Sequence, residues 1–257
     1  MIKADLHIHS NINKRLGYFP LFYDSVQTVE QIISRALISN IKIISITDHD
    51  SLAGFYEAQN IIDKSNLELM LLPGCEVSSH DGHILAYNIY KEIKQGMSAQ
   101  ETIEAIHEQN GIAVAAHPFS FNSIKNKVYQ LELDALEGYN ATASAYANLK
   151  TFLAACYLKI PNIAGSDAHQ VQEVGRSYME FPDNTPTVTD LLQKIVTGDF
   201  KVCFSKSNFF QVLMCHIYEN TRIQFRQLIT SSNLWSKSLP DKKVFGGETD
   251  VSSAAIN

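Results

Sequence analysis

The sequence has no excess of positive charge, and this lack excludes one class of partner. Its 21 lysine and arginine residues are outnumbered by 27 aspartate and glutamate residues, which gives a formal net charge of −6. A chain with this balance has no broad basic surface for binding long duplex nucleic acid. If its substrate is anionic, bound metal ions are a local source of the positive charge that the chain lacks.

Paired cysteines and long apolar runs are also missing. The four cysteines form no Cys-x-x-Cys pair, so we expect reduced thiols in a reducing compartment. The first ten residues, MIKADLHIHS, place an acid and two histidines where a signal peptide needs an apolar stretch. No apolar run approaches the roughly 20 residues of a membrane-spanning helix. These absences together predict a cytoplasmic protein with no membrane partner.

Short apolar runs rich in β-branched residues alternate with helical patterns along most of the chain. Such alternation implies parallel strands joined by helical crossovers, and seven predicted strands favour a barrel over an open sheet. The predicted strands are 2–6, 41–46, 69–72, 84–89, 112–116, 135–137 and 161–164, and the predicted helices are 28–39, 52–64, 98–110 and 142–159.

The pattern changes after about residue 206. Residues 208–230 carry apolar side chains at helical spacing, which favours a helix that packs on the barrel over a membrane or partner helix. Residues 231–257 are polar, and nothing in them indicates a function. We therefore predict a domain at 1–205 and a C-terminal helix with a polar extension at 206–257.

Histidines and acids follow the predicted strands. His7 and His9 end the first strand, and residues two apart in an extended chain point to the same side. Asp167 and His169 repeat this spacing after the last short strand. In an α/β barrel, the carboxyl ends of the strands form the rim where active sites are built. Six of the nine histidines lie at such rims: His7, His9, His49, His83, His117 and His169.

A single histidine near a strand end is more often a hydrogen-bonded structural residue than a metal ligand, but six of them argue against that interpretation. Imidazole and carboxylate form the ligand set that suits zinc, manganese or iron. With Glu76, Asp167 and one further acid they make nine donors, whereas one ion needs about three or four protein ligands. Two or three ions sharing a bridging carboxylate fit this number. Such a cluster lowers the pKa of bound water and holds the attacking and leaving oxygens of a displacement at phosphorus.

Residues 3–180 contain, in this order, the motifs DLHIHS, TDHDSLAG, GCEVSSHDGHILAY, HPFS, EGYN and SDAH. This series resembles the polymerase and histidinol phosphatase (PHP) family of metal-dependent phosphoesterases, and within it the branch that acts on nucleoside bisphosphates and RNA 5′ ends. The resemblance implies a distorted (β/α)7 barrel. It also implies a small phosphorylated substrate or a short oligonucleotide as partner.

The resemblance further implies a ligand set for each ion. One ion is expected at His7, His9, Glu76 and Asp167. A second is expected to share Glu76 and to use His83 and His117. A third is expected at His49 and His169 with an additional acid, for which Asp24 is the candidate. The family's Ser-Asp-Gly is replaced here by Asp24 followed by Ser25, which departs from the pattern.

The function expected from these residues is hydrolysis of a phosphomonoester or terminal phosphodiester by a metal-activated hydroxide. Four donors are candidates for catalytic roles: His83, His117, His169 and Asp167. Four further residues are candidates for substrate binding: Arg176, His80, Glu137 and Asn140. Arg176 suits a second phosphate because a guanidinium can donate two hydrogen bonds to it; the alternative for Arg176 is a surface ion pair, and for His80 an exposed loop position.

Two other interpretations stay open. A metal-dependent amidohydrolase also begins with His-x-His on a barrel strand, but it needs a metal-bridging lysine at the end of a middle strand, and 69–72 and 112–116 end without one. A catalytically silent PHP-type binding module is the alternative of another class. The presence of donors in every motif argues against such a module. An assay of metal content separates the enzyme from the silent module, because a silent module tolerates an empty site.

Overall fold

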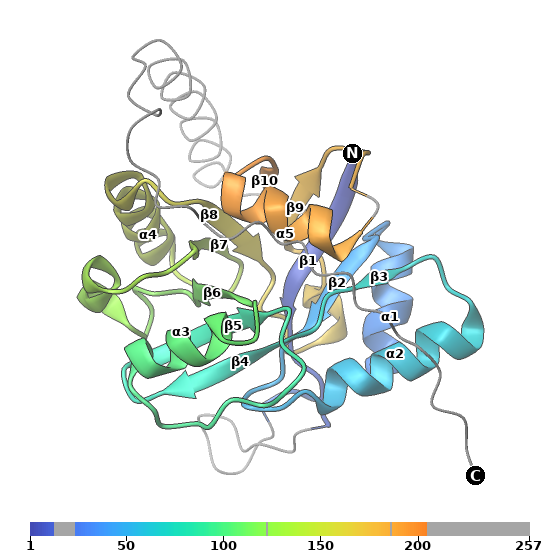
Figure 1. The fold of residues 1–257 in the computed structure, drawn as a ribbon. Coiled ribbons are helices and arrows are strands. Elements are labelled where there is room, and N and C mark those ends of the chain that lie inside the picture. Colours follow the sequence, from blue (N-terminus) through green and yellow to red (C-terminus); the bar gives the residue numbers. More distant parts are fainter. Residues whose placement is uncertain (13–23, 122, 186, 205–257) are drawn as a thin grey trace. The chain divides into compact units, whose positions relative to one another are not determined.

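The computed structural model describes residues 1–12, 24–121, 123–185 and 187–204, which form strands flanked by helices (Figure 1). The strands are β1 (Ile2–Ile8), β2 (Ile43–Ile46), β3 (Met70–Leu71), β4 (Gly74–Ser79), β5 (Gly82–Tyr87), β6 (Ile112–Ala115), β7 (Ala135–Asn140), β8 (Asn162–Gly165), β9 (Ser177–Phe181) and β10 (Lys201–Phe204). The helices are α1 (Val29–Ile38), α2 (Ala53–Ser65), α3 (Ala99–His107), α4 (Ala145–Leu158) and α5 (Val188–Thr197), with the short 3-10 helices η1 (Lys125–Gln130) and η2 (Val171–Glu173).

The strands form two five-stranded sheets, in the orders β10-β9-β1-β2-β3 and β4-β5-β6-β7-β8. The pairs β1–β2, β2–β3, β6–β7 and β7–β8 are parallel. The pairs β4–β5 and β5–β6 are antiparallel, as are the pairs that join β9 to β1 and to β10. The mixed α/β class is therefore confirmed, whereas the prediction that all strands run parallel is wrong.

A two-residue turn explains why the second sheet begins with antiparallel strands. His80 and Asp81 separate β4 from β5, and so short a connection joins antiparallel strands, whereas a parallel pair needs a crossover of about a dozen residues or more. The two sheets are bridged by isolated strand contacts, Ile8 with Ala168 and His49 with Glu76. Within the described ranges, continuous strand pairing therefore does not close the predicted (β/α)7 barrel.

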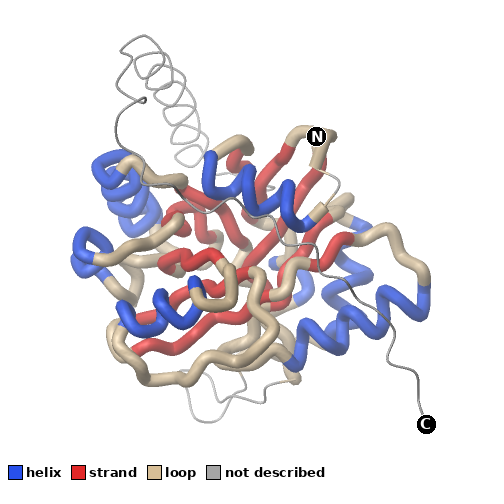
Figure 2. The backbone as a smooth tube through the Cα atoms, viewed as in Figure 1, coloured by secondary structure: helices blue, strands red, loops and turns tan. Residues whose placement is uncertain are grey.

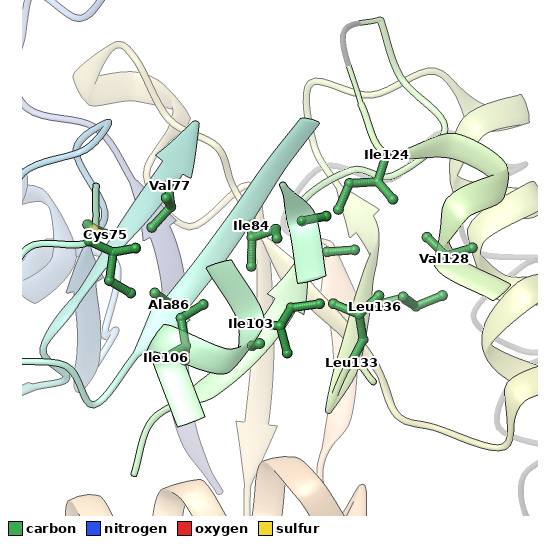
Figure 3. Close-up of a cluster of buried hydrophobic side chains, with 14 of the residues drawn as sticks. Cys75, Val77, Ile84, Ala86, Ile103, Ile106, Ile124, Val128, Leu133 and Leu136 are labelled. Carbon is green, nitrogen blue, oxygen red and sulfur yellow. The ribbon is translucent and has the colours of Figure 1, made fainter. Parts of the chain in front are cut away.

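The helices lie on the outside of the strands (Figure 2). Two clusters of apolar side chains hold them there. Helices α1 and α2 pack against the first sheet through side chains such as Ile32, Phe55 and Ile44. Helices α3 and α4 pack against the second sheet, and Figure 3 shows Ile84 and Ile103 within that cluster. This packing fixes the strands whose ends carry the polar residues described below.

The starts of two helices follow the sequence closely. Thr28 and Ser98 are the N-caps of α1 and α3, and each forms a capping box with the residue three positions later, Gln31 and Glu101. Strands β4, β9 and β10 and helix α5 were not predicted. No helix in the described ranges is long and apolar enough to span a bilayer. The predicted boundary at 205/206 and the segment 206–257 lie outside the described residues.

Candidate metal centre

Strand ends from both sheets bring histidines and carboxylates to one place. β1 contains His7 and is followed by His9, β4 contains Glu76, and His83 lies in β5 opposite the end of β4. The remaining donors lie after β2, β6 and β8 and before α1: His49, His117, Asp167, His169 and Asp24. Each of the nine predicted donors belongs to at least one group of three whose ligand atoms lie within 4.8 Å of one another.

Glu76 faces more imidazoles than a single ion pair requires. Its side chain is almost fully buried, and its Oε1 lies 3.0 Å from Nδ1 of His83 and 3.2 Å from Nε2 of His117. Its Oε2 lies within 3.5 Å of a nitrogen on each of three further histidines, His7, His9 and His49. One carboxylate therefore faces five imidazoles, as a ligand shared between two ions would.

Asp167 divides its two oxygens between the histidines and the surrounding protein. Oδ1 lies 3.4 Å from Nε2 of His7 and 3.3 Å from Nε2 of His9. Oδ2 accepts hydrogen bonds from Oγ1 of Thr142 at 2.6 Å and from Nδ2 of Asn140 at 3.2 Å. Because both of these hydrogen bonds fall on Oδ2, Oδ1 stays directed at the histidines.

Asp24 contacts the two donors that the other carboxylates approach least closely. Its Oδ2 lies 3.5 Å from Nε2 of His49 and 3.6 Å from Nε2 of His169. Oγ of Ser25 lies 2.9 Å from the carbonyl oxygen of His9 and 3.1 Å from that of His169. The serine that departs from the family pattern thus ties this acid to two donor-bearing segments.

Three histidines are oriented by partners on their Nδ1 atoms. Nδ1 of His7 lies 2.8 Å from Oε1 of Glu137, and Nδ1 of His117 lies 3.1 Å from Oγ of Ser123. Nδ1 of His169 lies 2.9 Å from the backbone carbonyl two residues earlier. A carboxylate or carbonyl oxygen accepts and cannot donate, so neutral His7 and His169 carry their proton on Nδ1. Their Nε2 lone pairs then face the cluster, as in metal-binding histidines.

Two donors have backbone conformations that non-glycine residues rarely adopt. Asp167 has a φ of 52° and His117 a φ of 30°, and such positions cost on the order of 1–3 kcal/mol each. The backbone N–H of Asp167 donates to the carbonyl of His7 at 2.8 Å, and that of His117 donates to Oε2 of Glu137 at 3.1 Å. Strain is thus held at the residues that the sequence predicted as ligands.

Burial and mutual attraction set the charges of the cluster. Burial raises the pKa of Glu76, but nearby imidazoles, chiefly those of His83 and His49, outweigh it and hold that pKa well below its ordinary value. Burial lowers the pKa of His9, yet its contacts with Asp167 and Glu76 outweigh burial and raise that pKa to about 10. Protonated imidazoles can thus balance the carboxylates, and divalent ions compete with those protons for the same nitrogens.

The donor set fits divalent transition-metal ions. Among the described residues, Oε1 of Glu76 and Nδ1 of His83 are buried without a hydrogen-bonding partner, although they lie 3.0 Å apart. Buried polar atoms without partners are rare in folded proteins because desolvating them costs free energy. An ion accepting a lone pair from each atom would remove that cost, and nitrogen with carboxylate ligands suits zinc, manganese or iron.

The four residues predicted to bind substrate occupy two kinds of environment. Glu137 and Asn140 are 0% exposed, and both oxygens of Glu137 accept hydrogen bonds from protein groups. His80 is exposed on the turn between β4 and β5 and contacts the next residue. Arg176 is also exposed and pairs with Oε1 of Glu173 at 3.1 Å. Their substrate roles stay predictions.

Several polar residues that support the donors were not predicted. Nε2 of Gln27 donates to the carbonyls of His9 and Ala168, both at 2.8 Å, and Thr142 and Ser123 contact donors as described above. Each joins segments that are far apart in the sequence or lies in an irregular loop. Hydroxyl and amide residues are common in loops, so their type and spacing carried no indication of this role.

Comparison with known proteins finds one matching family model and several relatives in sequence. Residues 145–200, which include α4 and α5, match a family model described as PHP-associated. The uncharacterized protein MJ1587 of Methanocaldococcus jannaschii is 34% identical over 143 residues, which cover 54% of this chain and 82% of that protein. The 5′-3′ exoribonuclease Rnm of Salmonella typhimurium is 34% identical over 89 residues, which cover 33% of this chain and 27% of the exoribonuclease.

A solved structure shows the same fold. It is a two-domain protein of Bacteroides vulgatus that contains a predicted PHP-like metal-dependent phosphoesterase, with a TM-score of 0.64 and 15% identity. The match covers 79% of this chain and 64% of that one, so the chain spans less than two thirds of this neighbour. At this level of identity the likeness shows the fold and nothing finer.

Proposed function

We propose that this chain, which belongs to the same family as MJ1587, is a metal-dependent phosphoesterase, and the proposal rests on its cluster of converging donors. The observation that carries the proposal is the position of Glu76, whose two oxygens face five imidazoles from segments of both sheets. A carboxylate so placed fits a bridge between divalent ions. When bound, such ions polarise phosphoryl oxygens and lower the pKa of water.

In this proposal two or three ions of manganese, iron or zinc are held by the nine donors. The first set is His7, His9, Glu76 and Asp167; the second is Glu76, His83 and His117; the third is Asp24, His49 and His169. The groups of converging donors match this division in part. One group lies wholly within the first set (His7, His9 and Glu76), and two others share two residues with the second or the third set (His49, Glu76 and His83; His9, Asp24 and His49). Five donors occur in more than one group, so the sets overlap at these positions: His7, His9, His49, Glu76 and Asp167.

Exposure distinguishes the donors that can reach a substrate. The side chains of His169 and His83 are 29% and 22% exposed, compared with 12% for His117 and 9% for Asp167. The leaving oxygen of a phosphoester needs a proton, and a histidine within reach of it can supply one. We assign proton transfer to His83, because the two ring nitrogens of His169 would be occupied by the backbone carbonyl of Asp167 and by an ion. His117, His169 and Asp167 would hold the ions that bind the reacting phosphate.

The proposed substrate is a phosphomonoester or terminal phosphodiester of a nucleotide or short oligonucleotide. Two observations support this class. The local likeness to Rnm connects part of the chain with an enzyme named as a 5′-3′ exoribonuclease. The net charge of −6 disfavours a surface that grips a long duplex, whereas a short substrate can be held by its terminal phosphate.

The test is hydrolysis by the purified full chain loaded in turn with manganese, iron and zinc. A panel of sugar phosphates, nucleotides, nucleoside bisphosphates and 5′-phosphorylated oligonucleotides should yield phosphate or mononucleotide from at least one member. Glu76→Gln serves as the inactive control, so that contaminating phosphatases are detected. A metal-loaded protein that hydrolyses none of these, or that hydrolyses amide substrates instead, would contradict the proposal.

A further inference from the structure

We propose that Glu137 is the positioning residue of the metal centre. It makes His7 bind an ion through Nε2, and it holds the segments that carry His117 and Asp167 in the orientation that completes the site. The inference rests on the proposed function. Glu137 lies in β7, is 0% exposed, and belongs to none of the groups of converging donors among the described residues. A buried carboxylate outside the donor set calls for another role, because desolvating it is costly.

Glu137 accepts hydrogen bonds from three residues at once, one in β1, one just after β6 and one in β7 itself. Its Oε1 lies 2.8 Å from Nδ1 of His7, in β1. Its Oε2 accepts from the backbone N–H of His117 at 3.1 Å and from Nδ2 of Asn140 at 3.0 Å. The contact with His117 fixes a residue whose φ is 30°, so the carboxylate stabilises a strained backbone as well as a ring. One side chain thereby sets the orientation of donors from the ends of β1 and β6.

Asn140 extends this control to Asp167. Its Nδ2 donates to Glu137 at 3.0 Å and lies 3.2 Å from Oδ2 of Asp167. Its Oδ1 accepts from the backbone N–H groups of Thr142 and Ala143, both at 2.9 Å, which fixes the amide orientation. With the NH2 group so directed, Oδ2 of Asp167 is occupied and Oδ1 remains for the ion. The chain of contacts therefore selects the ligating oxygen of Asp167 as well as the ligating nitrogen of His7.

Gly165 makes the close approach of Glu137 and His7 possible. A Cβ at this position would lie 2.3 Å from Oε1 of Glu137 and 2.6 Å from Cβ of His7. Real side chains do not tolerate such distances, so any larger residue would displace the carboxylate or the imidazole. The glycine in AGSDAH is thus required by the Glu137–His7 contact.

An amide cannot replace the carboxylate without changing the imidazole. If the NH2 group of a glutamine took the place of Oε2, it would face two donors, the N–H of His117 and Nδ2 of Asn140. If it took the place of Oε1, it would donate to Nδ1 of His7, and the ring proton would move to Nε2. The second arrangement avoids two unsatisfied donors and is therefore preferred. A protonated Nε2 cannot bind a metal ion.

The experiment compares zinc binding by the full chain in wild-type form and as Glu137→Gln, Glu137→Asp and Glu92→Gln. Glu92 is the matched control because its carboxylate accepts hydrogen bonds from Ser51 and Leu52 at the start of α2. Competition with a zinc chelator gives dissociation constants. Nitrogen-15 spectra of the zinc-loaded proteins show which ring nitrogen of His7 binds the ion. Melting curves of the zinc-free proteins separate positioning from stability.

Glu137→Gln should weaken zinc binding by about 10- to 100-fold, as for other groups that orient a ligating histidine. His7 should lose its Nε2 coordination, and Glu92→Gln should keep wild-type affinity and spectrum. Glu137→Asp keeps the charge but is one methylene shorter, so it should show a smaller loss. A folded Glu137→Gln protein with wild-type zinc affinity and unchanged His7 coordination overturns the inference, even if its melting temperature falls.

If Glu137→Gln does not fold, a wild-type zinc affinity in Glu137→Asp overturns the inference instead. Failure of the proposed function gives a different result. A wild-type protein that binds zinc and loses it in Glu137→Gln, yet hydrolyses no phosphoester, leaves the positioning role intact and removes the activity. If wild type is active and Glu137→Gln is equally active and binds as much metal, the proposed activity stands and the positioning role is refuted.

Discussion

Replacing Glu76 with glutamine should remove most of the metal bound by the protein. In wild type, both carboxylate oxygens face imidazoles, two on the Oε1 side and three on the Oε2 side. Glutamine keeps one oxygen, and its NH2 group, which cannot ligate, takes the other place. Breaking a buried charged interaction costs about 3–5 kcal/mol. At 1.4 kcal/mol per tenfold change, that weakens ion binding by roughly two to four orders of magnitude.

Elemental analysis after dialysis measures this loss directly. Glu76→Gln should retain less manganese, iron or zinc than His49→Ala, because His49 is one of the five rings around a carboxylate that serves all of them. Glu92→Gln should match wild type. Equal metal content in Glu76→Gln and wild type would remove the bridging role. A larger loss in His49→Ala than in Glu76→Gln would place the shared ligand elsewhere.

Three further outcomes are expected. Zinc affinity should rise between about pH 6 and about pH 8, because the raised pKa of His9 keeps its imidazole protonated and this proton must leave before an ion binds. Calorimetry in two buffers counts the released protons, and a zinc affinity that falls as pH rises would contradict the prediction. Gly165→Ala should lower the free energy of unfolding by about 1–3 kcal/mol and should also lower zinc affinity. In the control Gly111→Ala, the added Cβ would meet Ile106 and the backbone of Tyr87, so only the free energy of unfolding should fall. Arg176→Ala should raise KM for a nucleoside bisphosphate by about tenfold to a hundredfold and leave an aryl phosphate unaffected; unchanged KM for both assigns Arg176 to its ion pair with Glu173.

Much of the convergence of the donors could be predicted from the sequence, because it depends on strand periodicity and on the edge at which parallel strands end. His7 and His9 share one face of a strand, and the segments that follow parallel strands meet at one edge of a sheet. The helix starts at Thr28 and Ser98 were predicted for a similar reason, since a capping box is formed by residues three positions apart. The capping boxes and the spacing of His7 and His9 are local, because the residues involved lie within a few positions of one another. The meeting of strand ends is indicated by the strand–helix alternation that places parallel strands side by side.

The remaining features depend on contacts between distant segments. Strand β4 was not predicted because Gly74–Ser79 contains a glycine and polar residues, and its stability comes from pairing with β5. Glu137 is predicted from the sequence to bind substrate, since nothing in EGYN indicates that its side chain reaches back 130 positions to His7. The way in which the two sheets meet likewise depends on isolated bridges between distant residues, and the periodicity of the sequence does not indicate these bridges.

The two isolated bridges between the sheets have a consequence for how this protein tolerates sequence change. Ile8 and Ala168 are each flanked by donors, and the other bridge joins His49 to Glu76 themselves. The residues that would hold the ions are therefore also the residues at which one half of the framework is joined to the other. Ions bound there would act as cross-links between the sheets, and a substitution that empties the centre would loosen the joint. Constraints from ion binding and from the architecture would then fall on the same few positions, so these positions would not vary independently.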